Sequence, residues 1–169
     1  MLRKNAPSAD NQQGRSGNGF EPWYVSGFVD GEGSFHVAIY PDASVKTGWR
    51  IIPEFHVSQR VSSKHVLERL ILFFDCGYVK ANHQKNPRDV TFVYVVRDRN
   101  DLLKKIIPFF EKHQLQTEKA SDFKTFARVV RMMSQKIHCV SDGLQTIIEL
   151  AYTMNGSGRY RKRQKETIV

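Results

Sequence analysis

The sequence predicts a single α+β domain in which a four-stranded antiparallel sheet carries helices on one face. The chain has 169 residues, which is enough for one domain with a substantial core. Residues 34–39 and 49–60 alternate polar with apolar side chains, as half-buried strands do. Helical apolar patterns precede each of two predicted strand pairs, so the expected order is helix, two strands, helix, two strands and further helices.

The first helix is expected to begin at Pro22 and to end abruptly at a carboxylate between two glycines. Pro22 suits the first helical turn, because its missing N–H costs nothing there. Gly31 and Gly33 release the chain from helical geometry. Glu32 then lies at the C-terminal end of the helix, where the helix dipole disfavours negative charge. A carboxylate in such a place indicates a nearby cation; for an arbitrary chain the alternative is a helix-to-strand corner with Glu32 in solvent.

Turn residues and alternation place the remaining strands. Pro41 to Ser44, together with Gly48, predict a hairpin loop before the strand at 49–60. Residues 86–89 form the turn between a third strand at 78–84 and a fourth at 90–96. In the second strand, Ile51, Phe55 and Val57 share one face.

Cap signals place the remaining helices. Ser62 and Ser63 are expected to cap a helix that Gly77 ends, and Asn100 to cap a helix from 101 to about 113, which Pro108 kinks or splits. Another helix is expected to start at Ser121 or Asp122 and to reach Met133, and a final helix is expected at 144–154.

Composition divides the chain into three parts. Residues 1–20 are polar and are expected to be a flexible leader, residues 21–155 a single domain, and residues 156–169 a basic C-terminal tail. Basic residues at 3, 4 and 15 leave an organellar transit peptide open as an alternative for the leader. The chain holds two cysteines, too few for a disulfide framework or a zinc site. An intracellular location follows, either an organelle (chloroplast or mitochondrion) or a bacterial cytoplasm.

The net charge of +9 predicts a polyanionic partner, without separating DNA from RNA or an acidic membrane surface. No apolar run approaches the ~20 residues that span a bilayer, so no membrane partner is expected. The sheet face opposite the helices is expected to carry hydrogen-bonding side chains of mixed charge, as reading base edges requires. These candidate nucleic-acid contacts are Ser34, His36, Tyr40, Arg50, Glu54, His56, Ser58, Lys80, Asn82 and Gln84.

The segment from Val25 to Gly33, VSGFVDGEG, resembles the LAGLIDADG motif of homing endonucleases in the variant that closes with glycine and an acidic residue. The Ser34-Phe35 pair and the alternating strand that follow strengthen the resemblance. The expected order of elements is similar to the family's αββαββα fold, so the resemblance spans roughly residues 21–154. It implies a site-specific double-strand DNA endonuclease that depends on Mg²⁺ or another divalent cation. It also implies a long target, and a gene that typically lies within a group I intron.

The resemblance also implies roles for individual residues. Glu32 would bind the metal ion with help from the Gly31 carbonyl, and Gln59 would position the attacking water. Lys119 would stabilise negative charge at the phosphate, with Lys112 as the alternative. Lys64 or Arg60 would stand in for an arginine that some family members carry.

A single copy of the motif predicts a homodimer, because one site cuts only one strand. Packing of the motif helices about a two-fold axis would bring two copies of Glu32 together, with Ser26, Gly27 and Asp30 in the interface. Asp30 is expected to act structurally at the helix end. Each subunit would read one half of a pseudo-palindromic target.

Two alternatives to DNA cleavage remain. One is a splicing maturase that binds intron RNA, or a DNA-binding regulator, which keeps the fold without cutting. The other is a ribosome- or RNA-structure-binding monomer whose match to the motif is accidental.

Overall fold

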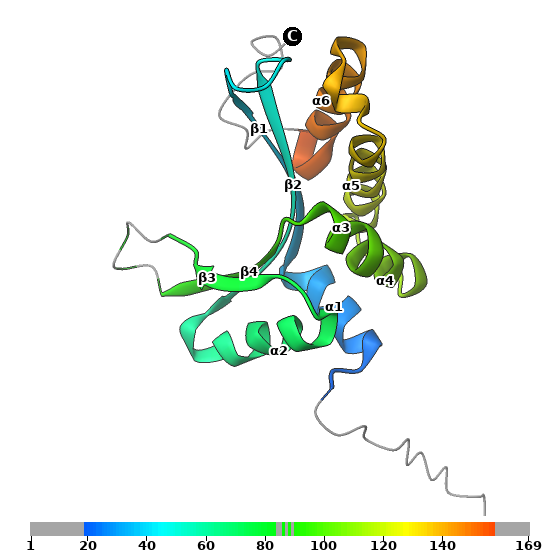
Figure 1. Cartoon of the computed structure of the whole chain (residues 1–169). Coiled ribbons are helices and arrows are strands. Elements are labelled where there is room, and N and C mark those ends of the chain that lie inside the picture. Colours follow the sequence, from blue (N-terminus) through cyan, green and yellow to red (C-terminus); the bar gives the residue numbers. More distant parts are fainter. Residues whose placement is uncertain (1–18, 84–85, 87, 89, 158–169) are drawn as a thin grey trace, which may run out of the picture.

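The computed structural model describes residues 19–83, 86, 88 and 90–157 (Figure 1). Most of the predicted leader, nearly all of the basic tail and the candidate contact Gln84 lie outside these residues.

The sheet has four antiparallel strands, as predicted, and their order is β1-β2-β4-β3. The strands are β1 (Gly33–Pro41), β2 (Trp49–Arg60), β3 (Tyr78–Ala81) and β4 (Thr91–Val96). β3 is shorter than the predicted 78–84, because the chain bends after Ala81. The N–H of Asn82 nevertheless donates to the carbonyl of Thr91 at 2.9 Å, so Asn82 stays beside β4.

The helices cover one face of the curved sheet and leave the other open (Figure 1). They are α1 (Pro22–Glu32), α2 (Lys64–Phe74), α3 (Arg99–Asp101), α4 (Ile107–Lys112), α5 (Lys119–Ser134) and α6 (Ser141–Ser157). A π-helical turn, Leu102–Ile106, joins α3 to α4 immediately before Pro108, so the predicted disturbance at this proline is confirmed. No helix in the described part of the chain is long and apolar enough to cross a bilayer.

Three predicted helix starts are wrong, and one predicted cap makes no side-chain hydrogen bond. Asp98 rather than Asn100 caps α3, because its side chain accepts the N–H of Asp101 at 2.9 Å. The side chain of Ser63 makes no capping hydrogen bond, since a short 3₁₀ turn (Val61–Ser63) leads directly into α2. α5 begins at Lys119, before the expected start, and α6 begins at Ser141 instead of Leu144.

Phenylalanine rings fill the space between the sheet and the helices. The ring of Phe35 on β1 lies 5.1 Å from that of Phe55 on β2, 5.6 Å from Phe110 on α4 and 5.3 Å from Phe126 on α5, measured between centroids. Each of these four side chains is at most 1% exposed. Ring contacts of this kind bury large apolar areas in defined geometries. The core therefore ties the first two strands to α4 and α5, which hold the site described next.

The predicted alternation in β2 is confirmed for Ile51, Phe55 and Val57, which are all buried in the core.

Candidate functional site

The corner between α1 and β1 leaves Glu32 exposed at the last position of the helix. The next residue, Gly33, is required by space. A Cβ atom there would lie 2.6 Å from Val29 Cγ1 and 2.8 Å from the Val29 carbonyl oxygen, distances that side chains do not tolerate. The backbone of Gly33 is ordinary extended chain, with φ of −84°. The last glycine of the motif therefore lets the strand turn closely over the helix end that carries Glu32.

Lys119, the first residue of α5, reaches back to the end of α1. Its Nζ atom donates to the carbonyl oxygens of Val29 at 2.9 Å and Asp30 at 2.8 Å, with a longer contact of 3.4 Å to Gly31. A cation is favourable at these carbonyls, because the C-terminal end of a helix carries partial negative charge. The structure thus places one cation where the position of Glu32 indicated that one should be.

Lys119 is also electrostatically coupled to its surroundings. Burial lowers the pKa of Lys119 below its usual value, while the carboxylates of Asp30, Glu32 and Asp122 oppose this change. The 3.4 Å contact of the ammonium group with the Gly31 carbonyl places it beside the residue that precedes Glu32. The two predicted catalytic charges of opposite sign therefore meet at one helix end.

Asp30 holds the segment that precedes α5. Its carboxylate accepts the N–H of Gln116 at 2.7 Å, and the N–H and hydroxyl of Thr117 at 3.3 and 2.8 Å. Burial alone would raise the pKa of Asp30, but these hydrogen bonds and Lys119 outweigh it, so the pKa lies below its usual value. Asp30 therefore remains ionised and acts as an acceptor within its own chain.

Gln59 lies near the end of β2, two residues beyond Val57, which pairs with Gly33 at the start of β1. It pairs with Phe92 of β4 and has the parity of Val57, which places it on the helix-covered side of the sheet. Among the described residues, no hydrogen bond joins Gln59 to Glu32 or Lys119. Its assignment to the attacking water stays a prediction.

The register of the strands brings the predicted contacts to the open face. The cross-strand pairs Ser34–His56, His36–Glu54 and Tyr40–Arg50 share that face with one another. Ser58 and Lys80 both lie opposite Val93 on β4, so they join the same surface. Asn82 continues this parity beyond the end of β3.

Two of the predicted contacts are held by ion pairs within the chain. Glu54 is only 6% exposed, and its carboxylate pairs with Arg97 and lies 2.8 Å from His56 Nε2. Arg50 pairs with Asp42 of the hairpin loop. The pKa of Asp42 is lowered to about 2, mainly by hydrogen bonds from Ser44 and further by Arg50. Glu54 and Arg50 therefore shape the charge of the open face, and a nucleic acid would compete for them with existing partners.

Arg97 is a residue of the open face that the sequence prediction missed. It follows β4 directly at the parity of Val93 and Val95, and it pairs with Glu54. Continuing the alternation of the fourth strand by one residue would have placed Arg97 on the open face. The predicted strand, however, ended at residue 96. Its side chain is 43% exposed, so it can donate to phosphate or base edges as well.

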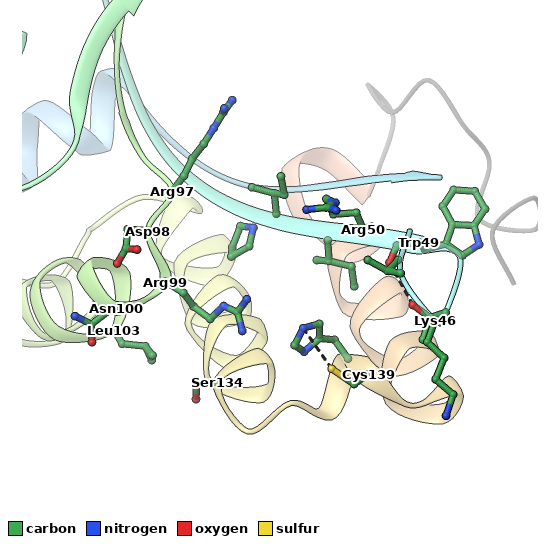
Figure 2. Close-up of a pocket in the computed structure, with 16 residues that line it drawn as sticks. Lys46, Trp49, Arg50, Arg97, Asp98, Arg99, Asn100, Leu103, Ser134 and Cys139 are labelled. Carbon is green, nitrogen blue, oxygen red and sulfur yellow. Dashed lines mark hydrogen bonds between the residues drawn. The ribbon is translucent and has the colours of Figure 1, made fainter. Parts of the chain in front are cut away.

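A hollow of about 850 Å³ lies beside the start of β2. Figure 2 shows Arg50, Arg97 and Arg99 around it, with Arg97 pointing away from the helices. His138 and Cys139 lie on its far side, with the sulfur 3.8 Å from His138 Nε2. The hollow therefore lies between the start of β2 and the C-terminal end of α5, and three arginines line it.

The outer face of α1 is apolar and flat. Trp23 is 73% exposed, and a Cβ atom added at Gly27 or Gly31 would meet nothing within 4 Å. Ser26, one of the residues expected at the interface, is only 8% exposed, and its hydroxyl donates to the carbonyl of His113 at 3.0 Å. Gly27 therefore faces outward, whereas Ser26 faces the interior of its own chain.

Comparison with known proteins agrees with this geometry. The sequence profile described as LAGLIDADG endonuclease matches residues 25–130, which is more than half of the chain. The chain belongs to the LAGLIDADG endonuclease family. It is similar to the crystal structure of the homing endonuclease I-TnaI, with a TM-score of 0.80 and 41% identity over 89% of this chain and 99% of that one. The predicted fold class is thereby confirmed.

Longer relatives contain this LAGLIDADG domain as a part. The chain is 32% identical to the probable intron-encoded endonuclease 3 of Neurospora crassa over 79% of its own length but 24% of the relative's. It is also similar to I-SmaMI bound to cleaved DNA, with a TM-score of 0.76 and 30% identity over 81% of this chain and 44% of that one. The chain thus spans a quarter of that curated relative and less than half of I-SmaMI.

The residues of this LAGLIDADG corner fit a divalent metal ion. Within the described residues no three His, Cys, Asp or Glu side chains gather as a metal cluster. Mg²⁺ does not need one, because it keeps several waters and binds through one or two carboxylates plus phosphate oxygens. Glu32 supplies an exposed carboxylate and Gly31 a carbonyl oxygen at the same helix end. Water and phosphate oxygens would complete the shell of a metal ion held by these two groups.

Glu54 is expected to make the stability of this domain depend on acidic pH. Burial favours the protonated form, but His56 and Arg97 outweigh it and hold the pKa of Glu54 below its usual value. The unfolded chain therefore binds the proton first as the pH falls. The stabilisation is present above the unfolded pKa and is lost as the pH drops through the folded one. Urea unfolding between about pH 3 and pH 7 should show a smaller acid loss for Glu54→Gln than for the wild type.

Glu68→Gln is the matched control, because Glu68 is exposed and pairs with Lys64 one turn away on the same helix. Such a surface pair contributes little to stability. Identical acid profiles for Glu54→Gln and the wild type would show that the buried ion pairs do not stabilise the fold.

Proposed function

We propose that this chain is a site-specific endonuclease that hydrolyses both strands of DNA as a homodimer with a divalent cation, preferably Mg²⁺. The observation that carries the proposal is the meeting of Glu32 and Lys119 at the end of α1, at the edge of an open polar sheet. Phosphodiester hydrolysis needs a metal-binding carboxylate and a cation near the phosphate, and this corner supplies both.

Each residue of the corner has a separate task. Glu32 and the Gly31 carbonyl would hold the metal ion, which supplies charge neutralisation and an activated water when bound. Lys119 uses two N–H donors at short distance on α1, and its third makes only the 3.4 Å contact to Gly31. That third donor is free to exchange for a phosphate oxygen without release of the other two. Gln59 would orient the water from the end of β2.

The homodimer is supported by the exposed face of α1. Trp23 on this face is 73% exposed, and the outward surface at Gly27 leaves room for a second helix to approach closely. Two copies joined through α1 would supply two Glu32 carboxylates, one for each DNA strand. We therefore keep Gly27 and Asp30 in the proposed interface and treat Ser26 as a buried support of α1.

The open face would bind the DNA. A net charge of +9 favours binding to a polyanion. The cross-strand rows of polar side chains carry the hydrogen-bonding groups that recognise base edges in the major groove. Each subunit would read one half-site of a pseudo-palindromic target. A gene within an intron is supported by the relative named as an intron-encoded endonuclease in Neurospora crassa.

Selection of cleavable sites from a randomised duplex library tests the proposal directly. Purified protein with Mg²⁺ is expected to recover a long, roughly symmetric site that is not cut when EDTA is present. Recovery of bound but uncut DNA would support a regulator of the same fold. Preference for intron RNA over every duplex, without cleavage, would support a maturase.

A further inference from the structure

Thr117 occupies the centre of a two-way connection between α1 and α5. Its hydroxyl donates to Asp30 Oδ1 at 2.8 Å. The hydroxyl oxygen of Thr117 also accepts the backbone N–H of Lys119 at 3.3 Å. The side chain of Lys119 then returns to α1 through the carbonyls of Val29 and Asp30. We call these contacts the Asp30–Thr117–Lys119 clasp. Val29 and Asp30 in the last turn of α1 are thereby joined to the start of α5.

The clasp is not explained by packing. Thr117 is exposed, and α5 starts two residues later without a side-chain hydrogen bond from its own capping residue, Glu118. The first N–H groups of a helix need acceptors outside the regular helical pattern. The Lys119 N–H donates to the Thr117 hydroxyl and the Ala120 N–H to the Thr117 carbonyl, so Thr117 supplies two acceptors at the start of α5. The position of Lys119 Nζ, several bonds away from the backbone, depends on that start being fixed.

We propose that Thr117 is a positioning residue for the proposed cleavage reaction, acting through Asp30 to fix Lys119 beside Glu32. The inference rests on the proposed function. Thr117 touches neither metal ligand nor catalytic side-chain atom; it sets the backbone from which the lysine extends. The rate of a reaction falls steeply when a reacting group moves by about 1 Å, because the group is no longer oriented for the transition state.

The sharpest test replaces the hydroxyl with a methyl group of nearly the same size. Thr117→Val keeps the β-branched shape but removes both hydroxyl hydrogen bonds. Thr117→Ser restores the hydroxyl and is the rescue. Thr125→Val makes the same substitution further along α5 and is the matched control.

The measurements separate binding from chemistry. The first is the Kd for target duplex in buffer with EDTA; the second is the single-turnover rate of cleavage after Mg²⁺ is added. We expect Thr117→Val to lower the cleavage rate by about 10- to 100-fold. Its Kd, dimeric state and melting temperature should stay close to those of the wild type. Thr117→Ser and Thr125→Val should both cleave at close to the wild-type rate.

The possible results separate this inference from the proposed function. Normal cleavage by Thr117→Val, in a preparation whose wild type cuts, would overturn the positioning role and leave the endonuclease standing. Equal losses in Kd and rate, or an equal loss in Thr117→Ser, would show a role in folding or binding and would also overturn it. A wild type that binds duplex and never cuts it would remove the proposed function itself.

Discussion

Replacing Glu32 with Gln is expected to lower the rate of DNA cleavage at least about a thousandfold, while DNA is still bound. The side chain keeps its size, but it loses the charge that attracts a divalent cation at the end of α1. A metal ion contributes several kcal/mol to the transition state of hydrolysis, and about 4 kcal/mol corresponds to a thousandfold. A supercoiled plasmid that carries the selected target, incubated with Mg²⁺, gives the nicking and linearisation rates.

Glu21→Gln is the control for this variant, because Glu21 lies at the opposite end of the same helix and makes no side-chain capping bond. It should cleave at close to the wild-type rate. Binding in EDTA should be unchanged or tighter in Glu32→Gln, since two fewer negative charges then face the DNA per dimer. Normal cutting by Glu32→Gln would remove Glu32 from the metal site.

Substituting Leu for Gly27 is expected to convert the proposed dimer into a monomer. The added side chain meets open space within its own chain, so the fold should survive. In a two-fold interface the side chain enters twice, at the place where the helices approach most closely. Overpacking at about 2 kcal/mol per copy would weaken the dimer by about 4 kcal/mol, or roughly a thousandfold in Kd. Sedimentation velocity over a range of concentrations measures the change.

Gly27→Ala provides a graded comparison, because one methyl group should weaken the dimer far less. Circular dichroism of the Leu variant should match that of the wild type if only association is lost. A stable dimer in Gly27→Leu would place the interface elsewhere on the molecule. The exposed indole of Trp23 would then need another partner.

The parts of the fold that the sequence predicted correctly are those with a local pattern. Alternation placed β1 and β2 and assigned Phe55 to the core, because side chains on a strand point to opposite faces in turn. Caps were predicted less well. Asn100 had the right chemistry, but Asp98 precedes it with the stronger acceptor and the correct spacing to Asp101.

The site shows the same division. The position of Glu32 at the end of α1 followed from proline and glycine signals, and the family resemblance pointed to Lys119. Neither source gave the ion pair of Glu54 with Arg97, which depends on the register between β2 and β4. Nor did the sequence reveal that Ser26 faces inward, because only the packing of α1 against the carbonyl of His113 decides its side.

The amino-acid sequence alone determined that a carboxylate would lie at the junction between the first helix and the first strand. Proline, glycine and side-chain alternation predict such a junction because they act over a few neighbouring residues. Only the tertiary structure decided what surrounds that carboxylate. Asp30 and Gln116 stand 86 positions apart in the chain, yet their atoms lie 2.7 Å from each other. No periodic pattern encodes such a contact, because it forms only when the phenylalanine core has fixed the helices against the sheet.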